Sequence, residues 1–202
     1  RLKMGRSLAI EHPVEADIVV GVPDSAIPAA IGYANESKIP YTEGLIRNRY
    51  VGRTFISPNQ KLRELGVKTK FNVLNEVVRG QRIILIDDSI VRGTTTSRVI
   101  EMIKDAGAKE IHMRVSSPPI TSPCFFGVDM ATTSELIANK FSVEKIRKVL
   151  GADSLGFLSV NNLKESVNAS ENNYCKACFT GDYPMPVQLD FDKFHLEKIR
   201  QK

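Results

Sequence analysis

Short apolar runs alternate with mixed apolar and polar stretches along the first two thirds of the chain. The β-branched runs at 18–22, 82–87 and 111–115 predict strands buried on both faces, as in parallel sheets. The stretches at about 26–38 and 97–105 have helical patterns. Because strands alternate with helices, the sequence predicts an α/β fold, a mainly parallel twisted sheet flanked by helices.

The later pattern is less regular. A further strand is expected at 41–46, and two short helices at 143–150 and 154–163. The tail at 191–202 has the pattern of a final amphipathic helix. None of these four segments changes the expected α/β architecture.

Composition divides the chain into a larger domain and a small appendage. The sequence turns polar from residue 165, so we expect an α/β domain over 1–164 and a helical, cysteine-bearing C-terminal appendage over 165–202. Within the domain, the segment at about 47–70 is rich in arginine and lysine and has little apolar periodicity. We interpret this segment as a mobile lid loop.

Charge and hydropathy narrow the classes of function. The net charge of +5 suits an anionic small-molecule substrate, although a solvated surface would explain it equally well. The basic residues are dispersed and lack interleaved aromatic residues, which argues against a nucleic-acid partner. No apolar run has the length of a membrane helix, and no secretory signal is visible. We therefore expect a cytoplasmic protein with no membrane partner.

The most informative segment follows the apolar run at 82–87. This run ends in two adjacent carboxylates, Asp87 and Asp88, and a Gly-Thr-Thr-Thr turn at 93–96 then opens a helix. Backbone N–H groups and hydroxyls at such a helix start suit a phosphate monoester. The carboxylates would repel phosphate and suit instead a sugar diol and hydrated Mg²⁺. The combination indicates a ribose phosphate; the alternative is that Asp88 only caps a turn and the threonines only start a helix.

This segment resembles the 5-phosphoribosyl-1-pyrophosphate (PRPP) signature of type I phosphoribosyltransferases, and its variant at 87–95 resembles that of the amidophosphoribosyltransferase family. The resemblance extends from about Asp17 to Pro184. The other segments that carry it are 21–25, 38–41, 48–55, 117–119 and 175–181. It implies a glycosyltransferase that moves ribose-5-phosphate from Mg-PRPP to ammonia. The products would be 5-phosphoribosylamine and pyrophosphate, in the first step of de novo purine synthesis.

The resemblance also implies a role for individual residues. The pyrophosphate loop would consist of Gly21, Val22, Pro23, Asp24 and Ser25. Mg²⁺ would contact Ser25, Asp87 and Asp88, and the two aspartates would also hold the ribose hydroxyls. The remaining PRPP-binding residues would be Ser89, Arg92, Gly93, Thr94, Thr95 and Thr96, the last five around the 5-phosphate. The lid would supply the catalytic residues Arg49, Tyr50 and Arg53.

The three cysteines suggest a second cofactor. Cys175 and Cys178 form a CxxC, and Cys124 lies far upstream. Their contexts resemble those of the iron–sulfur subgroup of the family, which implies thiolate ligands of a 4Fe–4S cluster. The fourth ligand would precede Arg1. The alternative is that the cysteines are reduced thiols or form a disulfide.

The resemblance further implies an N-terminal glutaminase domain as a partner, homo-oligomers, and feedback inhibition by purine nucleotides. That domain would precede this sequence, so we expect the chain alone to use free ammonia and not glutamine. Two alternatives remain open. A salvage base phosphoribosyltransferase would need an aromatic hood, and the chain has no Trp. A non-catalytic PRPP-binding regulator would need a DNA-binding module, and none is visible.

Overall fold

A parallel sheet lies at the centre of the computed structural model, which describes residues 1–48, 70–128, 132–167 and 174–187. The sheet has four strands in the order β1-β4-β5-β6, and neighbouring strands run parallel. The strands are β1 (Ile18–Gly21), β4 (Arg82–Asp87), β5 (Glu110–Val115) and β6 (Ser154–Phe157). The predicted α/β fold with a parallel sheet is therefore confirmed.

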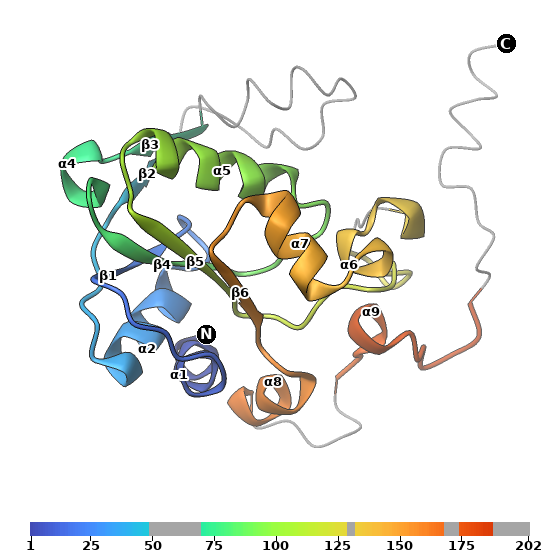
Figure 1. Ribbon diagram of the computed structural model, residues 1–202. Helices are drawn as coiled ribbons and strands as arrows, with labels where there is room; N and C mark the ends of the chain where they lie inside the picture. Colours follow the sequence, from blue (N-terminus) through green and yellow to red (C-terminus); the bar gives the residue numbers. More distant parts are fainter. Residues whose placement is uncertain (49–69, 129–131, 168–173, 188–202) are drawn as a thin grey trace, which may run out of the picture.

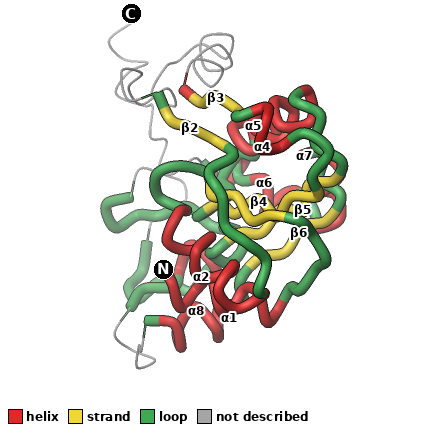
Figure 2. Tube along the Cα trace, turned by 90° about the vertical axis from the view of Figure 1, so that its left-hand side faces the viewer, coloured by secondary structure: helices red, strands yellow, loops and turns green. Residues whose placement is uncertain are grey.

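Helices cover both faces of the sheet. They are α1 (Leu2–Glu11), α2 (Ile27–Ser37), α4 (Asn75–Val78), α5 (Thr94–Asp105), α6 (Ile137–Lys140), α7 (Val143–Leu150), α8 (Val160–Ser166) and α9 (Ala177–Thr180), with a 3₁₀ turn, η2, at Thr133–Glu135. Figures 1 and 2 show α1, α2 and α8 below one face and α5 and α7 above the other. This cover explains why four consecutive residues of β4, from Ile83 to Ile86, are fully buried. In the described part of the chain, no helix is both long enough and apolar enough to cross a bilayer.

Two glycines allow α1 and α2 to touch along their backbones. A Cβ atom on Gly5 would lie 1.9 Å from the carbonyl oxygen of Ala29, and one on Gly32 would lie 2.1 Å from that of Leu2. Side chains of any size would therefore force the two helices apart. The contact fixes α1 against α2, the helix that directly follows the loop after β1.

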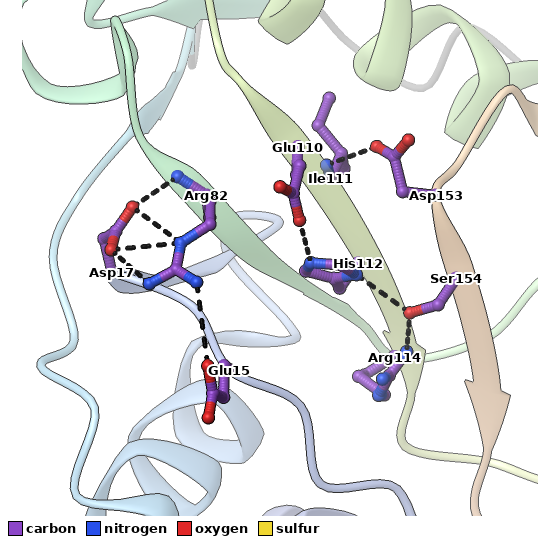
Figure 3. A network of polar contacts seen from close by, with 9 residues as sticks. All are labelled: Glu15, Asp17, Arg82, Glu110, Ile111, His112, Arg114, Asp153 and Ser154. Atoms are coloured by element: carbon purple, nitrogen blue, oxygen red, sulfur yellow. Dashed lines mark hydrogen bonds and ion pairs between the residues drawn. The ribbon is translucent and has the colours of Figure 1, made fainter.

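A buried arginine fixes the other end of α1. Arg114 on β5 is only 4% exposed, and its Nε donates a hydrogen bond of 2.9 Å to the carbonyl oxygen of His12. The Tyr33 hydroxyl donates to the same oxygen at 2.8 Å, and Arg114 also donates to Ser154 Oγ at 2.9 Å (Figure 3). Burial lowers the pKa of the Arg114 guanidinium. The last turn of α1 is thus held to the sheet by charge-assisted hydrogen bonds.

Polar pairs close the amino-terminal edge of the sheet. Arg82, at the start of β4, donates from its backbone and its Nη2 to the carboxylate of Asp17, each at 2.8 Å (Figure 3). These hydrogen bonds, led by the side-chain one, lower the pKa of Asp17 to about 2. His112 is buried, with its Nδ1 3.0 Å from Ser154 Oγ and its Nε2 3.1 Å from Glu110 Oε2. Hydrogen bonds between polar side chains therefore stabilise the amino-terminal edge of the sheet, opposite the predicted site.

A separate antiparallel ladder joins β2 (Leu45–Arg47) and β3 (Phe71–Val73). Just beyond the ladder, the N–H of Asn48 donates to the carbonyl oxygen of Lys70 at 2.8 Å. Both ends of the predicted lid at 47–70 therefore leave from one ladder. The lid residues Arg49, Tyr50 and Arg53 lie outside the described residues, as does the predicted helix at 191–202.

Three details differ from the sequence predictions. The expected helix at 154–163 is wrong over its first half, where Ser154–Phe157 form the edge strand β6 and only Val160–Ser166 are helical. Ser159 separates the two elements because its Oγ accepts a hydrogen bond from the Asn162 N–H and caps α8. The expected strand at 41–46 starts only at Leu45. Helix α1 was not expected at all.

Candidate active site

The loops that follow β1 and β4 lie side by side, because these strands are parallel neighbours in the sheet. Gly21 at the end of β1 is paired with Ile86 of β4, and the Val22 N–H donates to the Ile86 carbonyl oxygen at 2.8 Å. The predicted pyrophosphate loop (21–25) therefore starts next to the predicted magnesium and ribose residues at 87–88. Ligands in open α/β folds bind at this carboxyl edge.

The first loop presents a carboxylate and a hydroxyl to solvent. Asp24 and Ser25 are exposed, whereas Gly21, Val22 and Pro23 are buried. A Cβ atom on Gly21 would lie 3.0 Å from that of Ala30, so the strand end packs directly on α2. Arg47 Nη1 donates to Asp24 Oδ2 at 3.0 Å, which brings the end of β2 to this loop.

The second loop begins with the two adjacent carboxylates. The Asp88 N–H donates to Asp87 Oδ1 at 2.8 Å, and Ser89 Oγ donates to Asp88 Oδ1 at 3.1 Å. Burial, and then the neighbouring Asp88 carboxylate, raise the pKa of Asp87 to about 7. A divalent cation would reverse both effects, because it favours the ionised forms. The donor set of hard oxygens suits Mg²⁺.

The start of α5 has the form expected of an anion site. Gly93, its N-cap, has φ 78°, a left-handed conformation that favours glycine, and the Ser97 N–H donates to its carbonyl oxygen at 2.9 Å. Helix geometry leaves the N–H groups of the next three residues without acceptors inside the helix. Thr94 and Thr95 are exposed, so their hydroxyls can join those N–H groups. Thr96 is 4% exposed, so its side chain lies inside the fold.

The side chain of Arg92 is engaged by a residue that the sequence did not indicate. Its Nε and Nη2 donate to the two carboxylate oxygens of Glu135, at 3.0 and 3.2 Å. The guanidinium predicted to bind the 5-phosphate is thus held by a bidentate ion pair with η2.

Two more basic side chains lie at this edge: Lys70, the last residue of the predicted lid, and Arg1, which was not predicted from the sequence. Arg1, the N-cap of α1, donates to the Ser25 carbonyl oxygen, and its Nη1 lies 3.7 Å from Asp88 Oδ2. Lys70 lies near Asp87 and Asp24, whose charges act on its amine. Burial, and then the charge of Arg47, lower the pKa of Lys70 despite these carboxylates. The basic lid predicted at 47–70 included Lys70, whereas nothing in the sequence suggested Arg1.

The cysteines lie on a different part of the surface. The N–H groups of Thr121 and Ser122 donate to the Cys178 carbonyl oxygen at 2.9 and 3.1 Å, so the CxxC turn sits beside the loop that bears Cys124. Burial, and then the charges of Cys124 and Cys175, raise the pKa of Cys178. All three are free thiols. Within the described ranges, no three His, Cys, Asp or Glu side chains are grouped closely enough to hold a metal ion.

Known proteins resemble this chain over most of its length. A family model for the phosphoribosyl transferase domain matches residues 7–117, more than half of the sequence. An amidophosphoribosyltransferase of Archaeoglobus fulgidus is 59% identical over 189 residues, which are 93% of this chain and 41% of that protein. One of Bacillus subtilis is 54% identical over 194 residues, 94% of this chain and 41% of that protein. The chain therefore spans about two fifths of the length of these relatives.

A solved structure resembles this chain as well. Glutamine PRPP amidotransferase from B. subtilis, in complex with ADP and GMP, superposes with a TM-score of 0.83 at 53% identity. The match covers 94% of this chain and 42% of that one. The fold, the motif after β4 and these comparisons together establish that the chain belongs to the phosphoribosyltransferase family.

Proposed function

We propose that this chain is the synthase part of an amidophosphoribosyltransferase. It transfers ribose-5-phosphate from Mg-PRPP to ammonia and releases 5-phosphoribosylamine and pyrophosphate, in the first step of purine synthesis. The observation that carries this proposal is that two loops meet at one sheet edge: the 21–25 loop, and the 87–96 loop with its two carboxylates and the start of α5. The relatives are named amidophosphoribosyltransferases, and the similar B. subtilis structure is named a PRPP amidotransferase, which supports the same substrate.

In this proposal each loop binds a different part of PRPP. The N–H groups and hydroxyls at the start of α5 bind the 5-phosphate. Asp87 and Asp88 hold the ribose hydroxyls and, with Ser25, Mg²⁺, which when bound neutralises charge on the pyrophosphate leaving group. The loop at 21–25 binds that pyrophosphate. Three lid residues complete the proposed catalytic set: Arg49, Tyr50 and Arg53.

Basic side chains from separate elements would balance the charge of the leaving group. Arg47 contacts Asp24 of the pyrophosphate loop, and Lys70 lies near the same carboxylate. Both can approach the pyrophosphate as its bond to the ribose C1 loosens, and stabilise the developing charge. Neutral ammonia then attacks C1. It needs no general base before attack, so no base is assigned.

The first test is the release of pyrophosphate from PRPP by the purified chain, with and without Mg²⁺ and ammonium at mildly alkaline pH. We expect release that requires Mg²⁺ and is stimulated by ammonium. Glutamine in place of ammonium should produce no glutamate above the blank, because its hydrolysis is assigned to the glutaminase domain. Release that depends on an added purine or pyrimidine base would indicate a salvage enzyme instead. Tight PRPP binding without any release would indicate either a regulator or a synthase site whose catalysis requires the glutaminase domain.

We also propose that Cys124, Cys175 and Cys178 supply three thiolates of a 4Fe–4S cluster. The support is that the CxxC turn is hydrogen-bonded to the loop bearing Cys124, and that the three thiols influence one another electrostatically. Thiolates are the ligands that such clusters prefer. The cluster would tie the appendage at 165–202 to the α/β domain.

Anaerobic reconstitution with iron and sulfide tests the cluster. We expect bound iron and acid-labile sulfide in the wild-type chain and a loss of most of both in Cys175→Ser. Met185→Ser is the matched control, because Met185 is an exposed sulfur-bearing residue of the same appendage. Equal iron content in all three chains would refute the assignment, and so would an absence of iron and sulfide from the reconstituted wild type.

Four wider features belong to the same proposal. Purine nucleotides act as regulators, which is supported by the B. subtilis amidotransferase structure in complex with ADP and GMP. The chain assembles into homo-oligomers and associates with a glutaminase domain. We propose a cytoplasmic location, while the relatives from Glycine max and Arabidopsis thaliana are named chloroplastic.

A further inference from the structure

We propose that Glu135 is a positioning residue for the 5-phosphate loop: it holds Arg92 away from the phosphate and fixes the loop in its binding conformation. The inference rests on the proposed function, because it concerns the site of the same 5-phosphate. Glu135 lies 43 residues from Arg92 in sequence, in the 3₁₀ turn η2.

The carboxylate of Glu135 has well-defined partners on both sides. It accepts two hydrogen bonds from the Arg92 guanidinium, at 3.0 and 3.2 Å. Its Oε2 also accepts from the Thr132 N–H at 3.3 Å, which completes a capping box at the start of η2. The hydrogen bond from Arg92 is the main cause of the lowered pKa of Glu135. The carboxylate therefore stays ionised and directional at neutral pH.

The neighbours of Glu135 contact the same loop. The Ile137 N–H donates to the Val91 carbonyl oxygen at 2.9 Å. A Cβ atom on Gly93 would lie 2.9 Å from Cδ1 of Ile137, so that side chain packs directly on the glycine. Leu136 is fully buried in a small cluster that includes Val91. Residues 135–137 together therefore contact each of the loop residues 91, 92 and 93.

These contacts have a chemical consequence at the start of α5. With its guanidinium bound to Glu135, Arg92 is neutralised and turned to η2, and the phosphate is left to backbone N–H groups and threonine hydroxyls. Such donors bind well only when the loop holds them in place beforehand. Loss of the Glu135 charge would release Arg92 and loosen the conformation of Gly93. The 5-phosphate should then bind more weakly, whereas the pyrophosphate loop after β1 should be unaffected.

The test compares Glu135→Gln with Glu144→Gln. Glu144 on α7 makes the same kind of bidentate pair, with Arg147 at 2.7 and 2.9 Å, and among the described residues its ion-pair partners are on α7 itself. Calorimetry would measure the Kd of ribose 5-phosphate and of magnesium pyrophosphate for each chain. We expect Glu135→Gln to raise the Kd of ribose 5-phosphate about 10-fold, as the loss of a charged hydrogen bond implies. The Kd of pyrophosphate should stay within about 2-fold, and Glu144→Gln should change neither.

A merely structural role of Glu135 would weaken both ligands together or neither, so either result would overturn the inference. Tighter binding of ribose 5-phosphate would also overturn it, since Arg92 would then be a phosphate ligand that Glu135 restrains. Glu135→Asp, which keeps the charge on a shorter side chain, provides the same comparison if the Gln variant fails to fold; we expect a smaller but equally selective loss. A wild-type chain that binds neither ligand would overturn the proposed function as well.

Discussion

Replacing Asp87 with Asn should abolish most turnover and yet make the metal-free protein more stable. We expect magnesium-dependent pyrophosphate release to fall at least about 100-fold, because an amide cannot supply the anionic ligand that Mg²⁺ and the ribose hydroxyls require. The stability gain follows from the pKa of Asp87, which is about 7 in the folded chain and near 3.8 in the unfolded chain.

The direction of the pH effect follows from proton binding. Between pH 4 and pH 7 the folded state binds the Asp87 proton more tightly than the unfolded state does, so stability falls as pH rises through this window. Above pH 7 the Asp87 carboxylate is ionised, and its ionised form lowers the free energy of unfolding. Asn removes that loss of stability, and we expect a gain of about 2 kcal/mol at pH 8, measured by denaturant unfolding in EDTA.

Asp105→Asn is the matched control, because Asp105 is exposed at the far end of α5. It should leave turnover unchanged and shift stability by less than about 0.5 kcal/mol. Near-normal turnover of Asp87→Asn at saturating magnesium would exclude Asp87 from the site. A pH-independent stability difference would show that its carboxyl is not strained in the folded chain.

Replacing Gly5 with Ala should be the most destabilising of the conservative changes. The added methyl group would lie 1.9 Å from the Ala29 carbonyl oxygen, a backbone atom that cannot rotate away. Forced separation of the helices costs about 3 kcal/mol, against a gain of about 1 kcal/mol from better helix propensity. We expect a net loss of about 2 kcal/mol, or a Tm lower by about 5 °C.

Gly80→Ala distinguishes crowding from backbone strain. Gly80 has φ 73°, and a Cβ atom there would meet nothing within 4 Å. Its substitution should cost only about 1 kcal/mol. If both variants lost the same stability, the close approach of α1 and α2 would not be what Gly5 serves. Since α1 carries Arg1 to Ser25 and Asp88, Gly5→Ala should also weaken PRPP binding.

The central strands were predictable because a strand buried on both faces appears in the sequence as a nearly uninterrupted apolar run. The runs at 18–22, 82–87 and 111–115 became β1, β4 and β5 with nearly the same bounds. Strand β6 was missed because Ser154 and Gly156 interrupt its apolar run, and its place is set by pairing with β5. Helix α1 was missed because it buries only a narrow stripe, Gly5, Leu8 and Ala9.

The family resemblance already implied which two loops meet, because it assigns one Mg²⁺ to Ser25, Asp87 and Asp88. Parallel strands β1 and β4 bring those loops to one edge of the sheet. The sequence could not predict where the charged side chains of those loops point. The partner of Arg92 lies 43 residues away, and no spacing rule connects them. The same holds for Arg1, whose position depends on the packing of α1 against α2. The PRPP roles of individual residues remain predictions.

Helix α1 is synthesised long before some of the residues that it contacts in the folded structure. Glu11 at its end accepts hydrogen bonds from the Ser159 N–H, at 2.9 Å, and from the side chain of Asn162. These partners follow 148 and 151 residues later, which takes roughly 7–30 s of translation. The start of α8 therefore contacts a residue that lies 148 positions before Ser159 in the sequence. Co-translational folding can complete the α1–α2 pair early. The hydrogen bonds between Glu11 and the start of α8 form only after β6 and the start of α8 have emerged from the ribosome.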